Sequence, residues 1–381
     1  MRKACQIHPL KSTCRPMRSW DEITRERRTG VYLGMALGWS NTRAAFRDRW
    51  KRLQPFDRHR LVNAVKSYRV YNRNKNGKAM PQDSWPLSLS VEPTTSCNLR
   101  CPECPSGLRS FTRPTGMLEV ETLKHVLDEI GRHLVYLNLY FQGEPYLHPK
   151  MNELVRIGAT HGLYTSTSTN AHFLRPERCK EIVESGLSRL IISIDGMTQG
   201  TYASYRVGGQ LDKVLEGTRN MVEARRSNGG KGPHLVWQFL VVGPNEHEVQ
   251  TLKAHAQRIG VDELVIKTAQ IDQPKDGHPL LTEAPELRRY DRKPAGEWVL
   301  RNPLADECWR MWQGCVMTWD GRVVPCCFDK DAHYTMGKVS TQSFEEIWFS
   351  SEYEAFRSQI FSNRSALEMC QNCSEGSHAY A

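Results

Sequence analysis

The chain has 381 residues, of which 39% are hydrophobic and 25% charged, a composition that predicts a globular protein of one or two domains. No apolar run is long enough to span a membrane, since the best one covers only residues 30–39. Twelve cysteines without an export signal favour a reducing cytoplasm over a disulfide-stabilised secreted protein.

The net charge of +10 is unevenly distributed, because residues 1–80 hold 20 Lys and Arg against 5 Asp and Glu. Residues 1–84 form a basic N-terminal extension in which 1–20 predict a disordered tail, and Cys5 and Cys14 have no ligand spacing. Leu61, Val65 and Tyr68 recur at helical spacing and predict an amphipathic helix over 57–71. Such an extension suits an acidic partner, a membrane surface or nucleic acid, but a solvated helical cap is commoner.

Apolar runs and helical patterns alternate through the middle of the chain. We expect strands at 87–91, 135–141, 163–169, 189–194, 235–242 and 263–268, with helices near 119–133, 150–161, 176–185, 210–227 and 246–259. Six such repeats predict an α/β fold with a parallel sheet and outer helices. Functional groups in this arrangement gather where the strands end, because the loops there converge on one mouth.

Three cysteines follow the first of these strands in the sequence Cys97-Asn98-Leu99-Arg100-Cys101-Pro102-Glu103-Cys104. Three soft sulfur ligands within eight residues can hold one face of an iron–sulfur cluster, whereas a structural zinc site closes with four ligands. An iron that lacks a protein thiolate can bind a small molecule through its amino and carboxylate groups. The missing fourth ligand is therefore the informative feature of the motif.

This C-x3-C-x2-C motif after a first strand resembles that of the radical S-adenosylmethionine (SAM) superfamily. The resemblance implies a partial (β/α)6 barrel over residues 85–270, a [4Fe–4S] cluster on Cys97, Cys101 and Cys104, and SAM as cosubstrate. It also implies an electron donor such as flavodoxin or ferredoxin. Reductive cleavage of SAM would give a 5′-deoxyadenosyl radical that removes hydrogen from a substrate, and no residue is assigned as a substrate base.

Polar residues follow the second, third and fourth predicted strands in the order that this superfamily shows. Each motif alone is also an ordinary turn or strand exit. By resemblance, Gly143 and Glu144 bind the methionine amino group, and Glu144 is chemically an acceptor for an ammonium donor. The resemblance also implies contacts with the ribose and the methionine carboxylate from Ser168, Asn170, Ser193 and Asp195. Glu103 departs from the family, which often has an aromatic residue there near the adenine.

A second set of cysteines lies beyond a proline-rich connector at 271–307. Asp320-Gly321 predicts a two-residue hairpin turn over 316–324, and a helix is expected over 344–361. Two cysteines across the hairpin plus a distant C-x2-C can complete four-thiolate coordination, either of an iron–sulfur cluster or of structural zinc. The hairpin can bring Cys308 or Cys315 close to Cys326, and Cys370 and Cys373 form the C-x2-C pair after the helix.

Residues 308–381 resemble the SPASM/Twitch extensions of radical SAM enzymes, which implies one auxiliary [4Fe–4S] cluster. The ligands that the resemblance implies are Cys308, Cys326, Cys370 and Cys373, with Cys315 and Cys327 left open as replacements for Cys308 and Cys326. A four-thiolate cluster would act as an electron acceptor, which favours oxidation of a substrate that is a peptide or a small polar molecule. Epimerisation and carbon–carbon bond formation remain open alternatives. The rival hypothesis is a cluster- or zinc-binding protein whose basic N-terminus recognises nucleic acid.

Overall fold

The structure is a computed structural model that describes residues 38–77, 80–302 and 305–374. The predicted tail at 1–20, with Cys5 and Cys14, lies outside the described residues, as do the last seven residues of the C-terminal segment. Within the described ranges, no helix combines the length and the hydropathy that crossing a bilayer requires.

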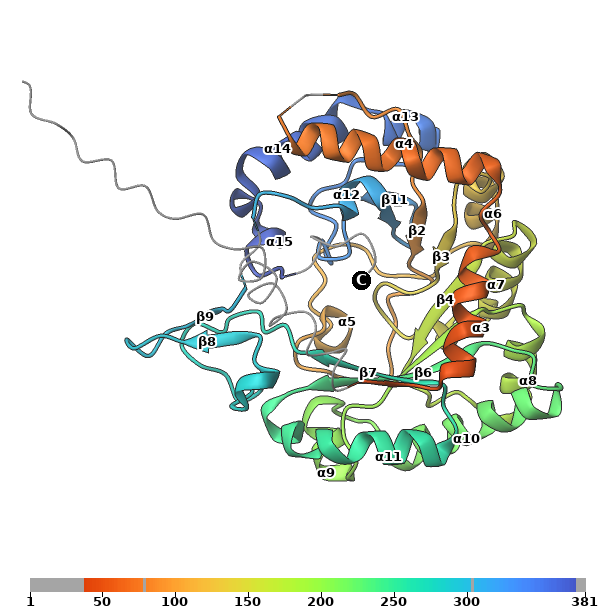
Figure 1. Cartoon of the computed structure of the whole chain (residues 1–381), viewed down its shortest axis with the longest axis vertical. Coiled ribbons are helices and arrows are strands. Elements are labelled where there is room, and N and C mark those ends of the chain that lie inside the picture. Colours follow the sequence, from red (N-terminus) through yellow and green to blue (C-terminus); the bar gives the residue numbers. More distant parts are fainter. Residues whose placement is uncertain (1–37, 78–79, 303–304, 375–381) are drawn as a thin grey trace, which may run out of the picture.

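One sheet of ten strands organises the described part of the chain, in the order β1-β7-β6-β5-β4-β3-β2-β10-β11-β12 (Figure 1). Strands β2 to β7 are parallel neighbours, as the alternating pattern predicts. At the edges of this set, β7 pairs with β1 and β2 pairs with β10, so the six strands do not close on themselves. The fold is therefore a partial barrel. The strands are β1 Trp39–Ser40, β2 Ser88–Val91, β3 Tyr136–Asn138, β4 Tyr164–Thr169, β5 Arg189–Ser193, β6 His234–Val241, β7 Glu263–Thr268, β10 Gly314–Met317, β11 Arg322–Val324 and β12 Gly337–Lys338.

Helices pack on the outside of these strands and cover their apolar surface. In α6, the predicted apolar stripe is fully enclosed, and Leu123, Val126 and Ile130 have no exposed surface. Burying such a side chain stabilises the fold by roughly 1.5–3 kcal/mol, so these stripes fix the helices to the sheet. The helices around the barrel are α5 Pro105–Leu108, α6 Val120–Ile130, α7 Met151–Thr160, α8 Pro176–Glu184, α9 Gln199–Tyr205, α10 Leu211–Ser227 and α11 Val249–Ile259, with short 3-10 helices η1 Pro145–Leu147 and η2 Gly243–Glu248.

The C-terminal cysteine-rich segment extends the barrel sheet. The predicted hairpin forms between β10 and β11, and Gly321 takes a left-handed φ of 82° in its turn. The helix expected over 344–361 is divided in two, because Ser350 accepts a hydrogen bond from the Tyr353 amide and starts a second helix. The connector carries a small β8–β9 hairpin that the sequence analysis missed. The remaining elements are η3 Pro285–Leu287, β8 Tyr290–Arg292, β9 Trp298–Leu300, α12 Arg310–Gln313, α13 Phe344–Trp348, α14 Ser351–Asn363, η4 Arg364–Ala366 and α15 Glu368–Gln371.

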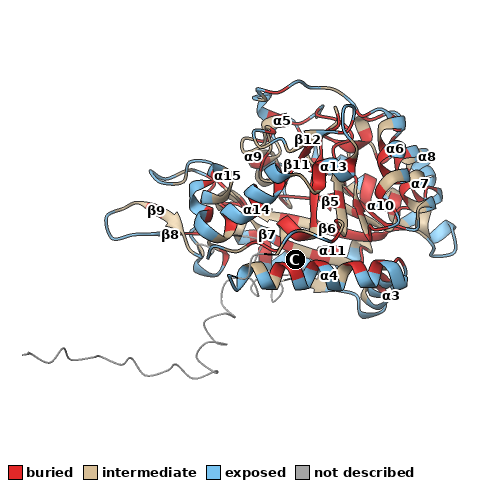
Figure 2. Cartoon of the chain, turned by 90° about the horizontal axis from the view of Figure 1, so that it is seen from above, coloured by how far each residue is buried: buried red, intermediate tan, exposed pale blue. Residues whose placement is uncertain are grey.

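Two consecutive helices, α3 (Thr42–Leu53) and α4 (Arg58–Lys75), lie on the side of the barrel where the strands begin (Figures 1 and 2). The predicted helix over 57–71 is confirmed, while α3 was not predicted. The apolar stripe of an amphipathic helix usually packs on the protein, but in α4 its residues Leu61, Val65 and Tyr68 are exposed. The inner face of α4 is instead largely polar: Arg60 donates hydrogen bonds to the carbonyls of Gly131 and His161.

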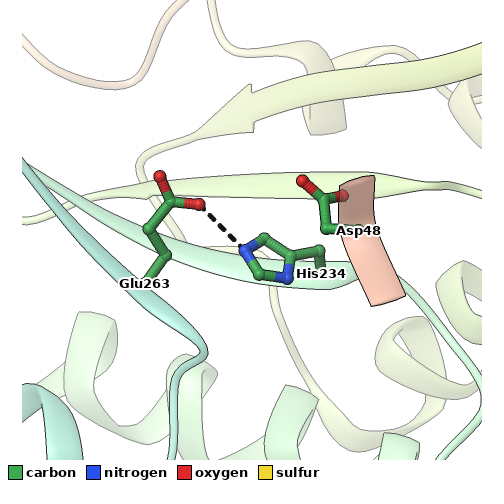
Figure 3. Close-up of side chains that lie close together, drawn as sticks. All are labelled: Asp48, His234 and Glu263. Carbon is green, nitrogen blue, oxygen red and sulfur yellow. Dashed lines mark hydrogen bonds and ion pairs between the residues drawn. The ribbon is translucent and has the colours of Figure 1, made fainter. Parts of the chain in front are cut away.

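An ion-pair network centred on Arg189 fixes α3 to this base of the barrel, and Figure 3 shows the three side chains around that arginine, Asp48, His234 and Glu263. Asp48 of α3 lies 3.0 Å from a guanidinium nitrogen of Arg189, whose other nitrogen lies 2.8 Å from Glu263. Glu263 also bonds to His234 at 2.9 Å. Burial opposes ionisation of Glu263, but the His234 hydrogen bond and the Arg189 charge bring its pKa down to about 2. Since a cationic side chain already lies between the carboxylates, we interpret the group as structural.

Candidate active site

The first cysteine motif lies on the loop that leaves the C-terminal end of β2, as expected. Leu99 is buried and holds the middle of the loop against the protein, and its amide donates to the Cys97 sulfur at 3.4 Å. Gly107 of α5 packs so tightly on this loop that a Cβ there would lie 2.5 Å from the Cys101 nitrogen. The loop is thus held from both sides, and Cys97 and Cys104 pack against the same hydrophobic cluster as Cys101.

These thiols lie in surroundings that disfavour a bare thiolate. Burial raises the pKa of Cys97 to about 11 and also raises that of Cys101, which Arg206 partly offsets. A metal or cluster cation supplies the positive charge that makes thiolates stable in such a place. The donor set and its burial therefore fit an iron–sulfur cluster.

The spacing of the sulfurs does not suit zinc. Tetrahedral zinc with Zn–S bonds of about 2.3 Å holds its sulfurs roughly 4 Å apart. Among the described residues, the one group of three or more His, Cys, Asp or Glu whose ligand atoms all lie within 4.8 Å of one another contains no cysteine. Both cysteine sets are therefore more widely spaced than zinc requires, whereas a cluster places iron and sulfide between its thiolates.

The loop after β3 packs directly against the cysteine loop. Gly143 has a left-handed φ of 75°, and a Cβ there would lie 2.2 Å from the Thr94 carbonyl oxygen. Only glycine fits this close approach. The next residue, Glu144, is buried and accepts hydrogen bonds from the Thr169 hydroxyl and the Asn170 amide, both at 2.7 Å. Glu144 thus links the loops after β3 and β4 directly behind the thiols.

The residues expected after β4 also reach this mouth. Asn170 donates from its side-chain amide to Asn98, which lies between the first two cysteines, at 2.8 Å. Ser168 is half-buried on β4, two residues before Asn170. The motif Ser168-Thr169-Asn170 is therefore in direct contact with the cysteine loop through Asn170.

After β5, Ser193 ends the strand and Asp195 is buried at the same mouth. Arg206 pairs with Asp195, and its guanidinium also lies 3.8 Å from the Cys101 sulfur. Asp195 additionally accepts from the Leu240 amide at 2.7 Å, which orients its carboxylate. Local sequence patterns do not distinguish Arg206 from a solvent-facing arginine, because Asp195 lies on another loop and Cys101 is more than one hundred residues away.

Glu103, where the family resemblance led us to expect an aromatic residue, turns toward the loop after β7. Its carboxylate accepts from the Asp272 amide at 2.9 Å and lies 3.4 Å from His278. This contact joins the first and last loops of the barrel mouth. Glu103 therefore has a structural role that its position in the motif did not reveal.

In the second cysteine set, Cys308, Cys326 and Cys370 belong to one buried cluster beneath α14. Cys373 lies beside this cluster as well, because Arg364 bonds to both Cys370 and Cys373. Burial raises the pKa of Cys308 and Cys370, as at the first site. The chain again supplies buried thiols that a cluster would stabilise.

The two open alternatives differ. Cys315 lies on β10 opposite Leu89 of β2 and belongs to the main hydrophobic core of the barrel. Cys327 packs beside Val316 and Val324 and also interacts with the adjacent Cys326 thiol, so it stays an alternative to Cys326 as a ligand. Arg364, which the sequence analysis missed, is buried beside the set and donates to the Cys373 sulfur at 3.2 Å.

Comparison with known proteins agrees with this geometry. Residues 91–257 match the model of the radical SAM superfamily, and residues 308–374 match that of SPASM, an iron–sulfur cluster-binding domain. A tungsten-containing aldehyde ferredoxin oxidoreductase cofactor-modifying protein of Pyrococcus furiosus is 24% identical over 319 residues, 75% of this chain and 86% of that one. The mycofactocin maturase of Mycobacterium tuberculosis is 26% identical over 287 residues, 70% of this chain and 71% of that one.

The solved structure of anSMEcpe with bound AdoMet has the same fold, with a TM-score of 0.55 and 16% identity over 77% of this chain and 86% of that one. This protein is a member of the radical SAM superfamily. It carries a C-terminal SPASM domain, and its cofactors are SAM, a [4Fe–4S] cluster and auxiliary iron–sulfur.

Proposed function

We propose that this enzyme uses radical SAM chemistry to oxidise or otherwise modify a peptide or a small polar molecule. The observation that carries the proposal is the meeting of three thiols with Glu144 and the Asp195–Arg206 pair at one mouth, where the strands end. When bound, the reduced cluster and SAM supply a carbon-centred radical that removes hydrogen from the substrate.

The roles of the residues at the mouth follow from their chemistry. Cys97, Cys101 and Cys104 are the proposed cluster ligands, and the carbonyl of Gly143 and the carboxylate of Glu144 are acceptors for the SAM amino group. Contacts with the ribose and the carboxylate of SAM fall to the polar group after β4 and β5, with Arg206 balancing the charge of Asp195. That polar group consists of Ser168, Asn170, Ser193 and Asp195.

The auxiliary site extends the proposal to oxidation. Four thiolates from Cys308, Cys326, Cys370 and Cys373 leave no open iron, so a cluster there transfers electrons and does not bind substrate. We assign residues 85–270 to the barrel, 271–307 to the connector and 308–381 to the auxiliary domain, with a flavodoxin or ferredoxin as external donor. Support for the ligand set comes from the joint burial of these thiols.

The peptide half of the substrate proposal has support from relatives. The mycofactocin maturase is 26% identical, and a PqqA peptide cyclase of Rhodopseudomonas palustris is 35% identical over 136 residues, 35% of each chain. Both names describe maturation or cyclisation. We therefore place this enzyme with those that act on a peptide, with a small polar molecule as the second candidate.

Anaerobic reconstitution with iron and sulfide, followed by SAM and dithionite, tests the core of the proposal. The protein is expected to release 5′-deoxyadenosine, and Cys97→Ala is expected to abolish this release and to lose about four iron ions per chain. Cys315→Ala is the matched control, because it removes a buried thiol outside both sets. Zinc without iron, or SAM cleavage that survives Cys97→Ala, would refute the assignment.

A further inference from the structure

The base of the barrel, opposite the mouth, carries an apolar surface that nothing in the described chain covers. Of the ten large hydrophobic residues that are exposed in the described ranges, seven lie on α3 and α4. The most exposed are Phe46 at 70% and Trp50 at 61%, both on α3. We name this group the α3–α4 face; its residues are Phe46, Trp50, Leu53, Leu61, Val62, Val65 and Tyr68.

The spacing of these residues shows that the face is continuous along each helix. Positions 46, 50 and 53 form one stripe on α3, and positions 61, 65 and 68 form another on α4, because residues three and four apart lie side by side on a helix. The two helices follow one another in sequence and lie on the same side of the molecule (Figure 2). Monomeric proteins rarely expose contiguous apolar surface without a partner.

The inner side of the same helices explains why these residues are not simply misplaced core. Asn63 exchanges hydrogen bonds with the backbone of Trp85, and the Ser67 hydroxyl donates to the Trp312 carbonyl at 3.0 Å. Asp48 is held in the ion-pair network of Figure 3. Polar contacts therefore fix the rotation of α3 and α4, and the apolar stripes point outward in the folded protein.

The charge of the two helices identifies the partner. Residues 38–77 hold eleven Lys and Arg against two Asp, and one of these, Asp48, is buried. Eight of the basic residues on α3 and α4 are exposed, and within the described ranges only Lys75 among them forms an ion pair, with Glu307. These residues are Arg43, Arg47, Arg49, Arg58, Lys66, Arg69, Arg73 and Lys75. An anionic surface complements them.

We propose that the α3–α4 face docks the enzyme on an anionic lipid bilayer, with the barrel mouth directed away from it. Helices with Trp, Phe and Leu beside Lys and Arg lie in the plane of a lipid interface, where apolar side chains enter the acyl boundary and cations meet the headgroups. The phosphates of a nucleic acid would pair with the basic residues, but a nucleic acid provides little apolar surface against which Leu and Val can pack. The combination of aliphatic and basic side chains therefore favours lipid.

Vesicle sedimentation of the reconstituted full chain tests this proposal. The protein is expected to sediment with vesicles of equal parts phosphatidylcholine and phosphatidylglycerol, to remain in solution with phosphatidylcholine alone, and to dissociate as salt rises. Trp50→Ser with Leu61→Ser is expected to weaken binding about tenfold or more, since each removes an apolar group from the interface. Arg47→Gln with Lys66→Gln is expected to weaken binding to the anionic vesicles by several-fold.

Leu108→Ser is the matched control, because Leu108 on α5 at the mouth is 56% exposed, as is Leu61. It is expected to leave vesicle binding unchanged. Equal loss with Leu108→Ser and with the double variant overturns the orientation. Failure to bind either vesicle overturns the proposal, in which case a stable dimer in solution or salt-sensitive RNA binding identifies a second copy or a nucleic acid as the partner.

Discussion

The two ends of the barrel hold side chains of similar chemistry in opposite arrangements. At the base, Asp48, His234 and Glu263 have the composition of a metal site, but the Arg189 guanidinium lies between the two carboxylates. At the mouth, the nearby Arg206 is balanced by Asp195, and the thiols are left for a cofactor. Residues that can bind a metal therefore indicate a metal centre only where no cationic side chain of the protein already lies between them.

Removing the central charge at the base is expected to have the largest effect on stability. Arg189→Gln removes the cation that Asp48 and Glu263 share, and leaves Asp48 paired with Arg52 and Glu263 bonded to His234. Removing one partner of a buried pair typically costs about 3–5 kcal/mol, and because these partners remain we expect a loss of about 3 kcal/mol in the free energy of unfolding. Urea denaturation measures the loss. SAM cleavage per folded molecule is expected to be unchanged, because the network lies at the opposite end from the thiols.

The exposed pair Arg226–Glu223 provides the control for this substitution. Arg226→Gln is expected to change stability little, because water and salt screen a pair at the surface. If Arg226→Gln lowers the free energy of unfolding as much as Arg189→Gln does, the base is not a buried ion-pair network.

The same network predicts how stability depends on pH. Since the pKa of Glu263 falls from 4.5 to about 2 on folding, its charged form stabilises the native state by about 3 kcal/mol above pH 4.5. That contribution is expected to disappear as pH falls from 4.5 toward 2. Unfolding free energies measured across this range should show the slope in the wild type and a shallower slope in Glu263→Gln. Parallel slopes in the two proteins would contradict the assigned pairing.

The regular barrel elements were predictable because they depend on short-range pattern. Strand periodicity, the helix stripes and the order of the mouth motifs are encoded within a few residues, and the strand ends brought Glu144 and Asn170 beside the cysteine loop as expected. The pairing of β2 with β10 was not predictable, because it joins segments more than two hundred residues apart. The outward apolar face of α4 was missed for the same reason, since distant carbonyls bind Arg60 and fix its rotation.

At the mouth, Gly143→Ala tests whether the loop after β3 must touch the cysteine loop. The new methyl group would lie 2.2 Å from the Thr94 carbonyl oxygen, so the loop has to move and SAM cleavage is expected to fall about a hundredfold. Gly229→Ala also introduces a side chain at positive φ, but into open space. It carries the same backbone strain without the clash and is expected to retain activity. Equal losses would show that strain alone, and not contact between the loops, is responsible.

Arg364 allows the smallest and most specific test. Its guanidinium donates hydrogen bonds to Cys373 and Cys370, two of the proposed auxiliary ligands. A positive charge beside a cluster favours the reduced form, which carries one more negative charge. Arg364→Gln is therefore expected to lower the auxiliary reduction potential by on the order of 60 mV, a tenfold change for a one-electron couple. An EPR-monitored titration of the reconstituted protein measures it.

Arg310→Gln supplies the comparison for this shift. Arg310 lies 3.7 Å from Cys327, outside the proposed ligand set, and its charge acts more weakly than that of Arg364 on the Cys308 thiol. A clearly smaller shift is expected there, and the SAM-binding cluster should keep its potential in both variants, since Arg206 at the mouth is unaltered. If Arg310→Gln lowers the auxiliary potential as much as Arg364→Gln does, then Cys327 is the better candidate for the ligand position assigned to Cys326. The two arginines thus decide between adjacent cysteines by a measurement that does not depend on substrate or turnover.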